Sequence, residues 1–254
     1  MSAPTSAAKR ESVMERGMKM KDEEKLYKRD GILYPTIMSP PENLDALKDL
    51  EAREDDLAGQ MPPRRFFATH LHPDFIPASF KTNKTKMLVV FRNPKDTLVS
   101  YYHFMNSNPV LPKVESWDKF CSDFLSGEVA WGSYFDHALA WEKHMDDPNV
   151  LIMAYEELKE NLPEGVKKVA DFFSFPLTDE QVDAIAGEST FSAMRTSSEN
   201  SHGKFGNVFF RKGEVGDWKN HFSEAQSKQM DEEFKKKLSG TRLGAKLKYE
   251  QYCQ

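Results

Sequence analysis

The chain has 254 residues, 39% of them apolar, and a formal net charge of −5 at pH 7. This length and apolar content suit one α/β domain, and the negative charge argues against a nucleic-acid-binding surface, which needs basic side chains. No apolar run reaches the length of a membrane span, no hydrophobic signal core is present, and the two cysteines lack metal-site spacing. We therefore expect a cytoplasmic protein without bound metal.

The first quarter of the chain carries weak structural patterns. Residues 1–25 are charged and show no clear apolar period, which predicts a mobile N-terminal tail followed by a single domain over residues 26–254. Leucines at 44, 47 and 50 predict a short amphipathic helix. Residues 66–70 are predicted to form a strand that ends at His70.

A second strand leads directly into a helix. The continuous apolar run Met87–Phe91 predicts a strand that is buried on both faces. Asn93 is a favoured helix N-cap, and Pro94 suits the first helical position. Because α/β proteins hold phosphates where a strand turns into a helix, Arg92 and Ser100 could both face such a ligand. Taken singly, Arg92 could equally be a surface charge and Ser100 a small helix residue.

The rest of the chain alternates in the same way. The apolar run Val150–Ala154 predicts a third strand, and Tyr155 follows it at once. Strands that alternate with helices predict an α/β fold with a parallel sheet flanked by helices. The other predicted helices begin at or after Ser116, Tyr134, Glu164, Thr178 and Ser223.

Arg211, Lys212 and Gly213 follow one another in the segment 209–220. A guanidinium group can bind two phosphate oxygens, an ammonium group adds a compact charge, and glycine lets the backbone approach an anion. These three residues alone would fit a basic surface turn closed by Trp218 equally well. The full segment, which continues Gly-Asp-Trp-Lys, is much more specific.

This segment resembles the C-terminal signature of the cytosolic sulfotransferases, which take a sulfuryl group from 3'-phosphoadenosine 5'-phosphosulfate (PAPS). The run that begins at Arg92 and continues to Phe104 resembles another segment of the same family. The resemblance is closest to the 6B type and covers about residues 26–254. It implies a sulfotransferase fold of the P-loop nucleotide hydrolase type, a small hydroxyl acceptor that we expect to be a phenol, adenosine 3',5'-bisphosphate as product, and no metal.

The resemblance also implies roles for individual residues. Arg92, Ser100, Arg211, Lys212 and Gly213 would bind the 3'-phosphate of the donor. Tyr155 would contact the adenosine, although a buried tyrosine with a satisfied hydroxyl is the plainer interpretation. The remaining residues implied at the nucleotide are Ser189, Thr190, Phe191, Met194 and Phe210, of which the first four also suit an ordinary helix start.

His70 is the candidate catalytic base. A histidine has a pKa near neutrality, which suits removal of a proton from an acceptor hydroxyl. Most histidines are simply satisfied polar groups. Thr69, His70 and Leu71 resemble the Thr-His-Leu of the family, in which this histidine is the base, so we favour the catalytic role. His72 has no such match and is expected to be a loop residue.

One family element is missing from the sequence. The family begins its sheet with a strand and a loop of the type Tyr-Pro-Lys-x-Gly-Thr-x-Trp that binds the phosphosulfate. Residues 51–56 resemble the approach to that strand, yet the next family element begins at Phe66. We therefore expect that a strand–loop–helix unit of roughly 30 or more residues is deleted. Ala68 also stands where many members have a lysine.

The missing loop leaves an alternative open. Charged groups such as the missing lysines supply a large share of catalysis. The chain could therefore be an impaired variant that acts, if at all, as a non-catalytic nucleotide-binding protein. A phosphate-transferring kinase is disfavoured because no Walker loop is present. We also expect a monomer, because Glu224 and Lys228 depart from the family's dimerisation segment at 219–228.

Overall fold

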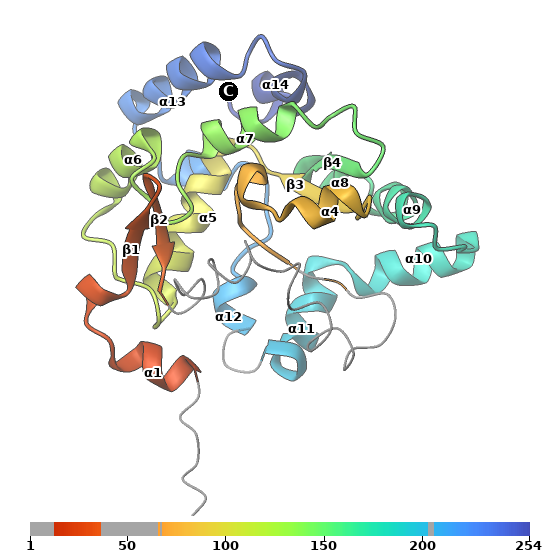
Figure 1. Ribbon diagram of the computed structural model, residues 1–254, viewed down its shortest axis with the longest axis horizontal. Helices are drawn as coiled ribbons and strands as arrows, with labels where there is room; N and C mark the ends of the chain where they lie inside the picture. The colour runs from red at the N-terminus through yellow and green to blue at the C-terminus, as the bar shows by residue number, and fades with distance from the viewer. Residues whose placement is uncertain (1–12, 37–65, 67, 203–205) are drawn as a thin grey trace, which may run out of the picture.

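The computed structural model describes residues 13–36, 66, 68–202 and 206–254. The helix expected around 44–50 and the junction of the expected deletion lie outside the described residues. Strand β3 (Met87–Phe91) pairs in parallel with β4 (Val150–Ala154), with Met87 opposite Val150 and Phe91 opposite Ala154. Helices surround this sheet, so the α/β class with a parallel sheet is confirmed (Figure 1).

The core lies between the sheet and the helices that connect its strands. These are α5 (Pro94–Ser107), α6 (Trp117–Ser126) and α7 (Tyr134–Glu142). The C-terminal helices α13 (Glu224–Lys237), α14 (Arg242–Lys246) and α15 (Tyr249–Tyr252) pack against the same core. In Figure 1, α13 and α14 lie on the opposite side of the sheet from α11 (Phe191–His202) and α12 (Gly206–Phe209).

Side-chain caps fix the helix starts where the sequence predicts them. The Asn93 side chain accepts a hydrogen bond from the Asp96 amide at 2.8 Å, with Pro94 in the first turn. Thr178 caps α10 (Asp179–Glu188) and Ser223 caps α13, each with a glutamine three residues later that completes a capping box. Ser116 caps α6 and Ser133 caps α7. Between β4 and α10 lie α8 (Tyr155–Glu160) and α9 (Leu162–Phe173).

The N-terminal part has more regular structure than we expected. Residues 13–25 contain α1 (Val13–Lys19) and the 3-10 helix η1 (Asp22–Glu24). They lead into the hairpin of β1 (Leu26–Arg29) and β2 (Ile32–Pro35). Its turn residues Asp30 and Gly31 have φ angles of 51° and 82°, the conformation that two-residue hairpins need and that Asp-Gly favours.

Two strand predictions are wrong. No strand forms over the described residues of 66–70, which lead instead into the 3-10 helix η3 (Pro73–Phe75) and α4 (Ala78–Thr82). Strand β3 is not buried on both faces, because Leu88 and Val90 are 37% and 47% exposed. A strand needs a neighbour for its backbone groups, and within the described residues this sheet has only β3 and β4.

Candidate active site

The turns that follow β3 and β4 are joined by a buried hydrogen-bonded pair. The Asn93 amide and side-chain nitrogen both donate to Oε1 of Glu156, at 2.9 and 2.8 Å. Both residues are fully buried, so this link holds the start of α5 beside the start of α8. These turns lie at the carboxyl ends of parallel strands, where α/β proteins carry their sites.

Asp96 ties the start of α5 to the loop that contains the predicted phosphate-binding residues. One carboxylate oxygen accepts from the Gly216 amide at 2.7 Å, and the other accepts from the Trp218 amide at 3.0 Å. Gly216 has a φ of 90°, a conformation that disfavours any side chain. The loop from Arg211 to Trp218 is therefore fixed against the N-terminus of α5.

Arg92 and Tyr155, which were predicted separately, are in contact. The guanidinium carbon of Arg92 lies 4.7 Å from the centre of the Tyr155 ring. The same side chain donates to the carbonyl of Glu214 at 2.6 Å, which places it against the loop from Arg211 to Trp218. Its Nε is buried and has no hydrogen-bond partner in the part of the chain that the structure describes. One donor of the Arg92 guanidinium is therefore unpaired.

Arg211 and Lys212 are both paired with one carboxylate. Arg211 lies 2.5 Å and Lys212 lies 2.6 Å from the two oxygens of Asp217, which is almost fully buried. Burial raises the pKa of Asp217, but the hydrogen bonds from Lys212 and Arg211 outweigh it and lower the pKa well below its usual range. Asp217 therefore stays charged and orients both cations, a role that the sequence pattern did not reveal.

Gly213 brings the predicted adenine-binding aromatics to this loop. Its φ is 65°, and a Cβ atom at this position would lie only 2.1 Å from Cδ2 of Phe191. The Phe191 and Phe210 rings are 6.2 Å apart. Of the other residues predicted here, Ser189 ends α10, the Thr190 hydroxyl accepts from the Ala193 amide at the start of α11, and Met194 lies half-buried one turn on.

His70 lies in a group of aromatic and histidine side chains. Its ring centre is 4.6 Å from that of Trp131, and burial by these neighbours lowers its pKa although the residue keeps an exposed surface. His137 and His72 have ring centres 6.1 Å apart. Burial first, then the charges of His72 and His70, lower the pKa of His137 to about 4. The sequence reading overlooked His137, which has no local signal.

The comparisons with known proteins decide the family. The sulfotransferase domain family matches residues 20–242 of the chain. The chain belongs to the sulfotransferase family. Sulfotransferase 6B1 of Danio rerio is 60% identical over 291 residues, which cover 96% of this chain and 98% of the relative. Human sulfotransferase 6B1 is 56% identical over 193 residues, 76% of this chain but 64% of the relative. The 6B-type resemblance is thus confirmed.

Solved structures of similar shape support the fold. Mouse sulfotransferase SULT7A1, solved in complex with PAP, has a TM-score of 0.79 at 32% identity and covers 89% of this chain and 99% of its own. Retinol dehydratase in complex with androsterone and PAP has a TM-score of 0.65 at 27% identity. The match covers 82% of this chain and 64% of the retinol dehydratase chain. The 291 residues of the zebrafish match exceed the 254 of this sulfotransferase, so part of that relative has no counterpart here.

Ser100 is exposed on α5 of this sulfotransferase. One turn further, Phe104 packs on Phe209 with ring centres 5.9 Å apart, so this face of α5 approaches the residues before Arg211. His103, which we did not single out from the sequence, lies close by. Burial and the positive charge of Arg211 lower its pKa.

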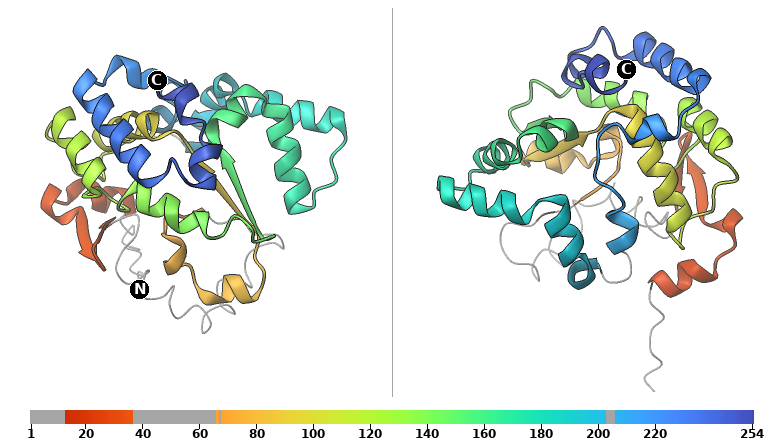
Figure 2. Two further views of the ribbon diagram at one scale, coloured as in Figure 1. Left: turned by 90° about the horizontal axis from the view of Figure 1, so that it is seen from above. Right: turned by 180° about the vertical axis from the view of Figure 1, so that it is seen from behind.

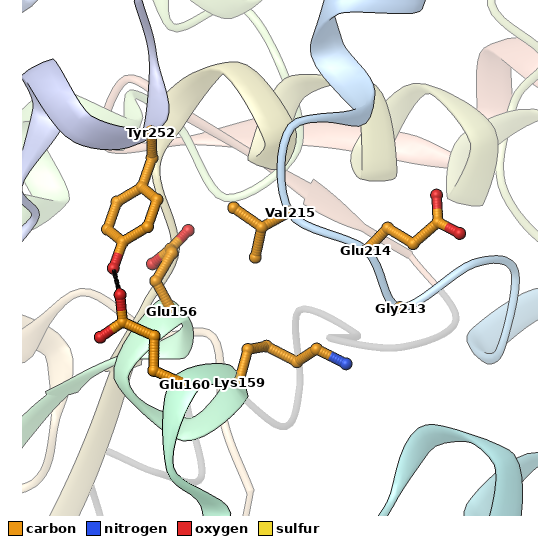
Figure 3. A pocket seen from close by; sticks show the side chains of 7 residues that line it. All are labelled: Glu156, Lys159, Glu160, Gly213, Glu214, Val215 and Tyr252. Carbon is orange, nitrogen blue, oxygen red and sulfur yellow. Dashed lines mark hydrogen bonds between the residues drawn. The ribbon is translucent and has the colours of Figure 1, made fainter.

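An open pocket of about 440 Å³ borders the loop from Arg211 to Trp218 of the sulfotransferase, at Gly213, Glu214 and Val215. Residues of α8 form one wall, the loop forms the other, and Tyr252 closes one end through a hydrogen bond to Glu160 (Figure 3). Neither His70 nor Arg92 lines this pocket. In the described residues, no group of three histidine, cysteine or acidic side chains could hold a metal ion, and no helix is long and apolar enough to cross a membrane.

Proposed function

We propose that this sulfotransferase transfers a sulfuryl group from PAPS to the hydroxyl of a small acceptor, with a phenol as the expected acceptor. The observation that carries the proposal is the convergence of separately predicted donor-site residues. Arg92 contacts both Tyr155 and the loop of Gly213, and Gly213 in turn contacts Phe191. The similar proteins SULT7A1 and retinol dehydratase were solved with PAP, the product expected from this donor.

The charged groups of the site suit a 3'-phosphate. Arg211 and Lys212 would turn part of their hydrogen bonding from Asp217 to the phosphate, while Arg92 would use its unpaired Nε. Gly213 leaves its amide open to an anion because it has no side chain. Ser100 would donate its hydroxyl from α5, and Tyr155 and Phe191 would contact the adenosine with Ser189, Thr190, Met194 and Phe210 nearby.

In the proposed reaction, His70 accepts the proton of the acceptor hydroxyl as the hydroxyl oxygen bonds to sulfur. The bond between sulfur and the phosphate oxygen breaks, and the bisphosphate leaves with the electron pair. His70 must be neutral to act, and its lowered pKa keeps it neutral at physiological pH. The proton ends on His70, and the sulfuryl group ends on the acceptor.

We further propose that the segment missing relative to the zebrafish protein is the strand–loop–helix unit that would bind the phosphosulfate. The exposure of Leu88 and Val90 on β3 supports this placement, because a neighbouring layer would cover an apolar strand face. The same observation favours the second candidate function, a nucleotide-binding protein with little or no transferase activity. In either case we propose a cytoplasmic monomer.

A calorimetric titration with adenosine 3',5'-bisphosphate tests the proposed donor site. We expect micromolar binding, and adenosine 5'-monophosphate should bind at least about tenfold more weakly because it lacks the group that Arg211 and Lys212 would hold. Equal affinity for both nucleotides, or no binding of either, would contradict the site. An assay with labelled PAPS and a panel of phenols then separates the two functions, since binding without transfer favours the non-catalytic protein.

A further inference from the structure

The last residues of the chain contact the donor-site scaffold at several points. The Trp218 indole nitrogen donates to the carbonyl of Tyr252 at 2.8 Å, and the Lys95 ammonium donates to the carbonyl of Cys253 at 2.7 Å. The Cys253 thiol lies 3.4 Å from the side-chain oxygen of Asn93, the cap of α5. Figure 2 shows the C-terminus beside α13 and above the start of α5.

The Cys253 carbonyl helps to compensate the buried charge of Lys95. Its ammonium is fully buried, and a buried charge is costly unless several partners compensate for it. Ser227 accepts from it at 2.7 Å, Asp231 lies 2.6 Å away, and the Trp218 ring centre is 4.2 Å away. The Cys253 carbonyl completes this set. Lys95 stands in the first turn of α5, between Arg92 and Asp96, so the chain end is anchored next to the predicted phosphate ligands.

The same chain end is anchored on its other side to α8. The Glu160 carboxylate accepts hydrogen bonds from the Tyr252 hydroxyl, from the Gln251 side chain at 3.0 Å and from Lys248 at 3.3 Å. One turn earlier, Lys246 donates to Glu157 at 3.1 Å. Helix α8 begins with Tyr155, the residue that stacks on Arg92.

We propose that residues 246–254, here called the C-terminal clasp, position the donor site by holding the start of α5, the Trp218 loop and α8 together. The clasp contacts no expected ligand itself. It acts through Arg92, Tyr155 and the Gly213 loop, whose relative placement decides whether all three can reach one nucleotide. The ligand part of this inference rests on the proposed function.

Variants of Glu160 test the clasp without shortening the chain. Glu160→Ala removes the three hydrogen bonds that Glu160 accepts from the clasp and leaves the Lys246–Glu157 contact in place, while Glu160→Gln keeps an acceptor for the Tyr252 hydroxyl. Glu164→Ala removes an exposed glutamate in the first turn of α9, outside the set of residues that bond to the clasp in the described structure. Titration with adenosine 3',5'-bisphosphate should show at least about fivefold weaker binding for Glu160→Ala and less than about twofold change for the other two.

Deletion of residues 252–254 is the stronger test. Deletion of Gln254 alone removes only the bond that its carbonyl accepts from Lys219, and Cys253 still offers an acceptor to Lys95, so its effect should be the smaller of the two. Hydrogen exchange without ligand reports the clasp independently of nucleotide binding. We expect amides of residues 92–96 and 213–218 to exchange at least about tenfold faster in Glu160→Ala and in the longer deletion, with α9 and α10 unchanged.

The outcomes separate the two proposals. A parent chain that fails to bind the bisphosphate overturns the donor site, while local exchange changes would still support the clasp. The clasp proposal is overturned if the parent binds the bisphosphate and the Glu160→Ala variant has the same affinity and the same amide exchange rates. A uniform exchange increase that includes α9 and α10 also overturns it, because it would show a general loss of stability.

Discussion

Lys212 and Asp217 form an ion pair across the turn that contains Gly213 and Gly216, with 2.6 Å between ammonium and carboxylate oxygen. The carboxylate is 4% exposed, and it also holds Arg211 at 2.5 Å. The basic pair proposed to grip a phosphate is therefore oriented before any ligand arrives. Asp217 partly balances the charge of this pair and also holds the loop in place. The affinity of the pair for an anion and the stability of the loop therefore both depend on Asp217.

Asp217→Asn should lower the free energy of unfolding by about 2 kcal/mol at pH 7, because a neutral amide replaces the buried carboxylate that accepts charged hydrogen bonds from the partly exposed Arg211 and Lys212. The folded-state pKa of Asp217 is below its ordinary value of 3.8, so its contribution is present above that pH and is lost as the pH falls further. Urea unfolding should thus show a smaller difference between parent and variant at pH 3 than at pH 7. The same gap at both pH values would contradict this account, and the exposed Asp183→Asn serves as control.

Arg211→Ala should weaken binding of adenosine 3',5'-bisphosphate by about 2–4 kcal/mol, the loss of a charged two-point contact. Calorimetry on the folded variant provides the measurement. Lys228→Ala, which removes an exposed lysine further along the chain, should leave the affinity within about twofold of the parent. An unchanged dissociation constant for Arg211→Ala would show that the phosphate binds elsewhere.

His70→Ala should abolish transfer and leave bisphosphate binding nearly unchanged, because the base acts on the acceptor. Since burial lowers the pKa of His70, the neutral base should persist below pH 6.5, and the acid limb of kcat/KM should lie below that value. His72→Ala should keep most of the activity. Transfer at the parent rate by His70→Ala would direct attention to His137.

The chain should be a monomer at micromolar concentration. Glu224 and Lys228 are exposed and place charges where the family's dimerisation segment carries other residues, and unpaired charges oppose a small interface. Light scattering gives the mass directly. A dimer that disappears when residues 219–228 are altered would refute the prediction.

Transfer should be at least about a hundredfold slower than in a relative that contains the phosphosulfate loop, the scale of losing one preorganised charge-stabilising group. The thermal unfolding transition should also be broad or have a low midpoint, because Leu88 and Val90 on β3 expose apolar surface. Side-by-side assays with a complete 6B-type enzyme would check both. Comparable turnover would mean that another segment performs the work of the loop.

Local signals in the sequence were enough to predict much of this fold. The caps at Asn93, Thr178 and Ser223 depend on residues within one turn, so the helix starts are readable from a few letters. The apolar runs of β3 and β4 were readable for the same reason. The Asp30–Gly31 hairpin turn was also present in the sequence and was overlooked.

The remaining features depend on contacts between distant parts of the chain. The strand expected to end at His70 is absent because a strand is defined by its neighbour, which no local pattern reports. The approach of His137 to His70 and the bond from Trp218 to Tyr252 join separate elements. The family resemblance supplied the candidate donor residues, but it did not reveal that Asp217 pairs with two of them.

The pairing of β3 with β4 has a consequence for the order of folding. The two strands are separated in the chain by α5, α6 and α7, so no short turn can bring them together, whereas β1 and β2 close over two residues. Contacts between distant segments form slowly because the intervening chain must first lose its freedom. Arg92 and Tyr155 directly follow the two sheet strands, so their contact forms only when this late pairing is complete. We therefore expect the proposed donor site to be among the last parts of the molecule to form during refolding.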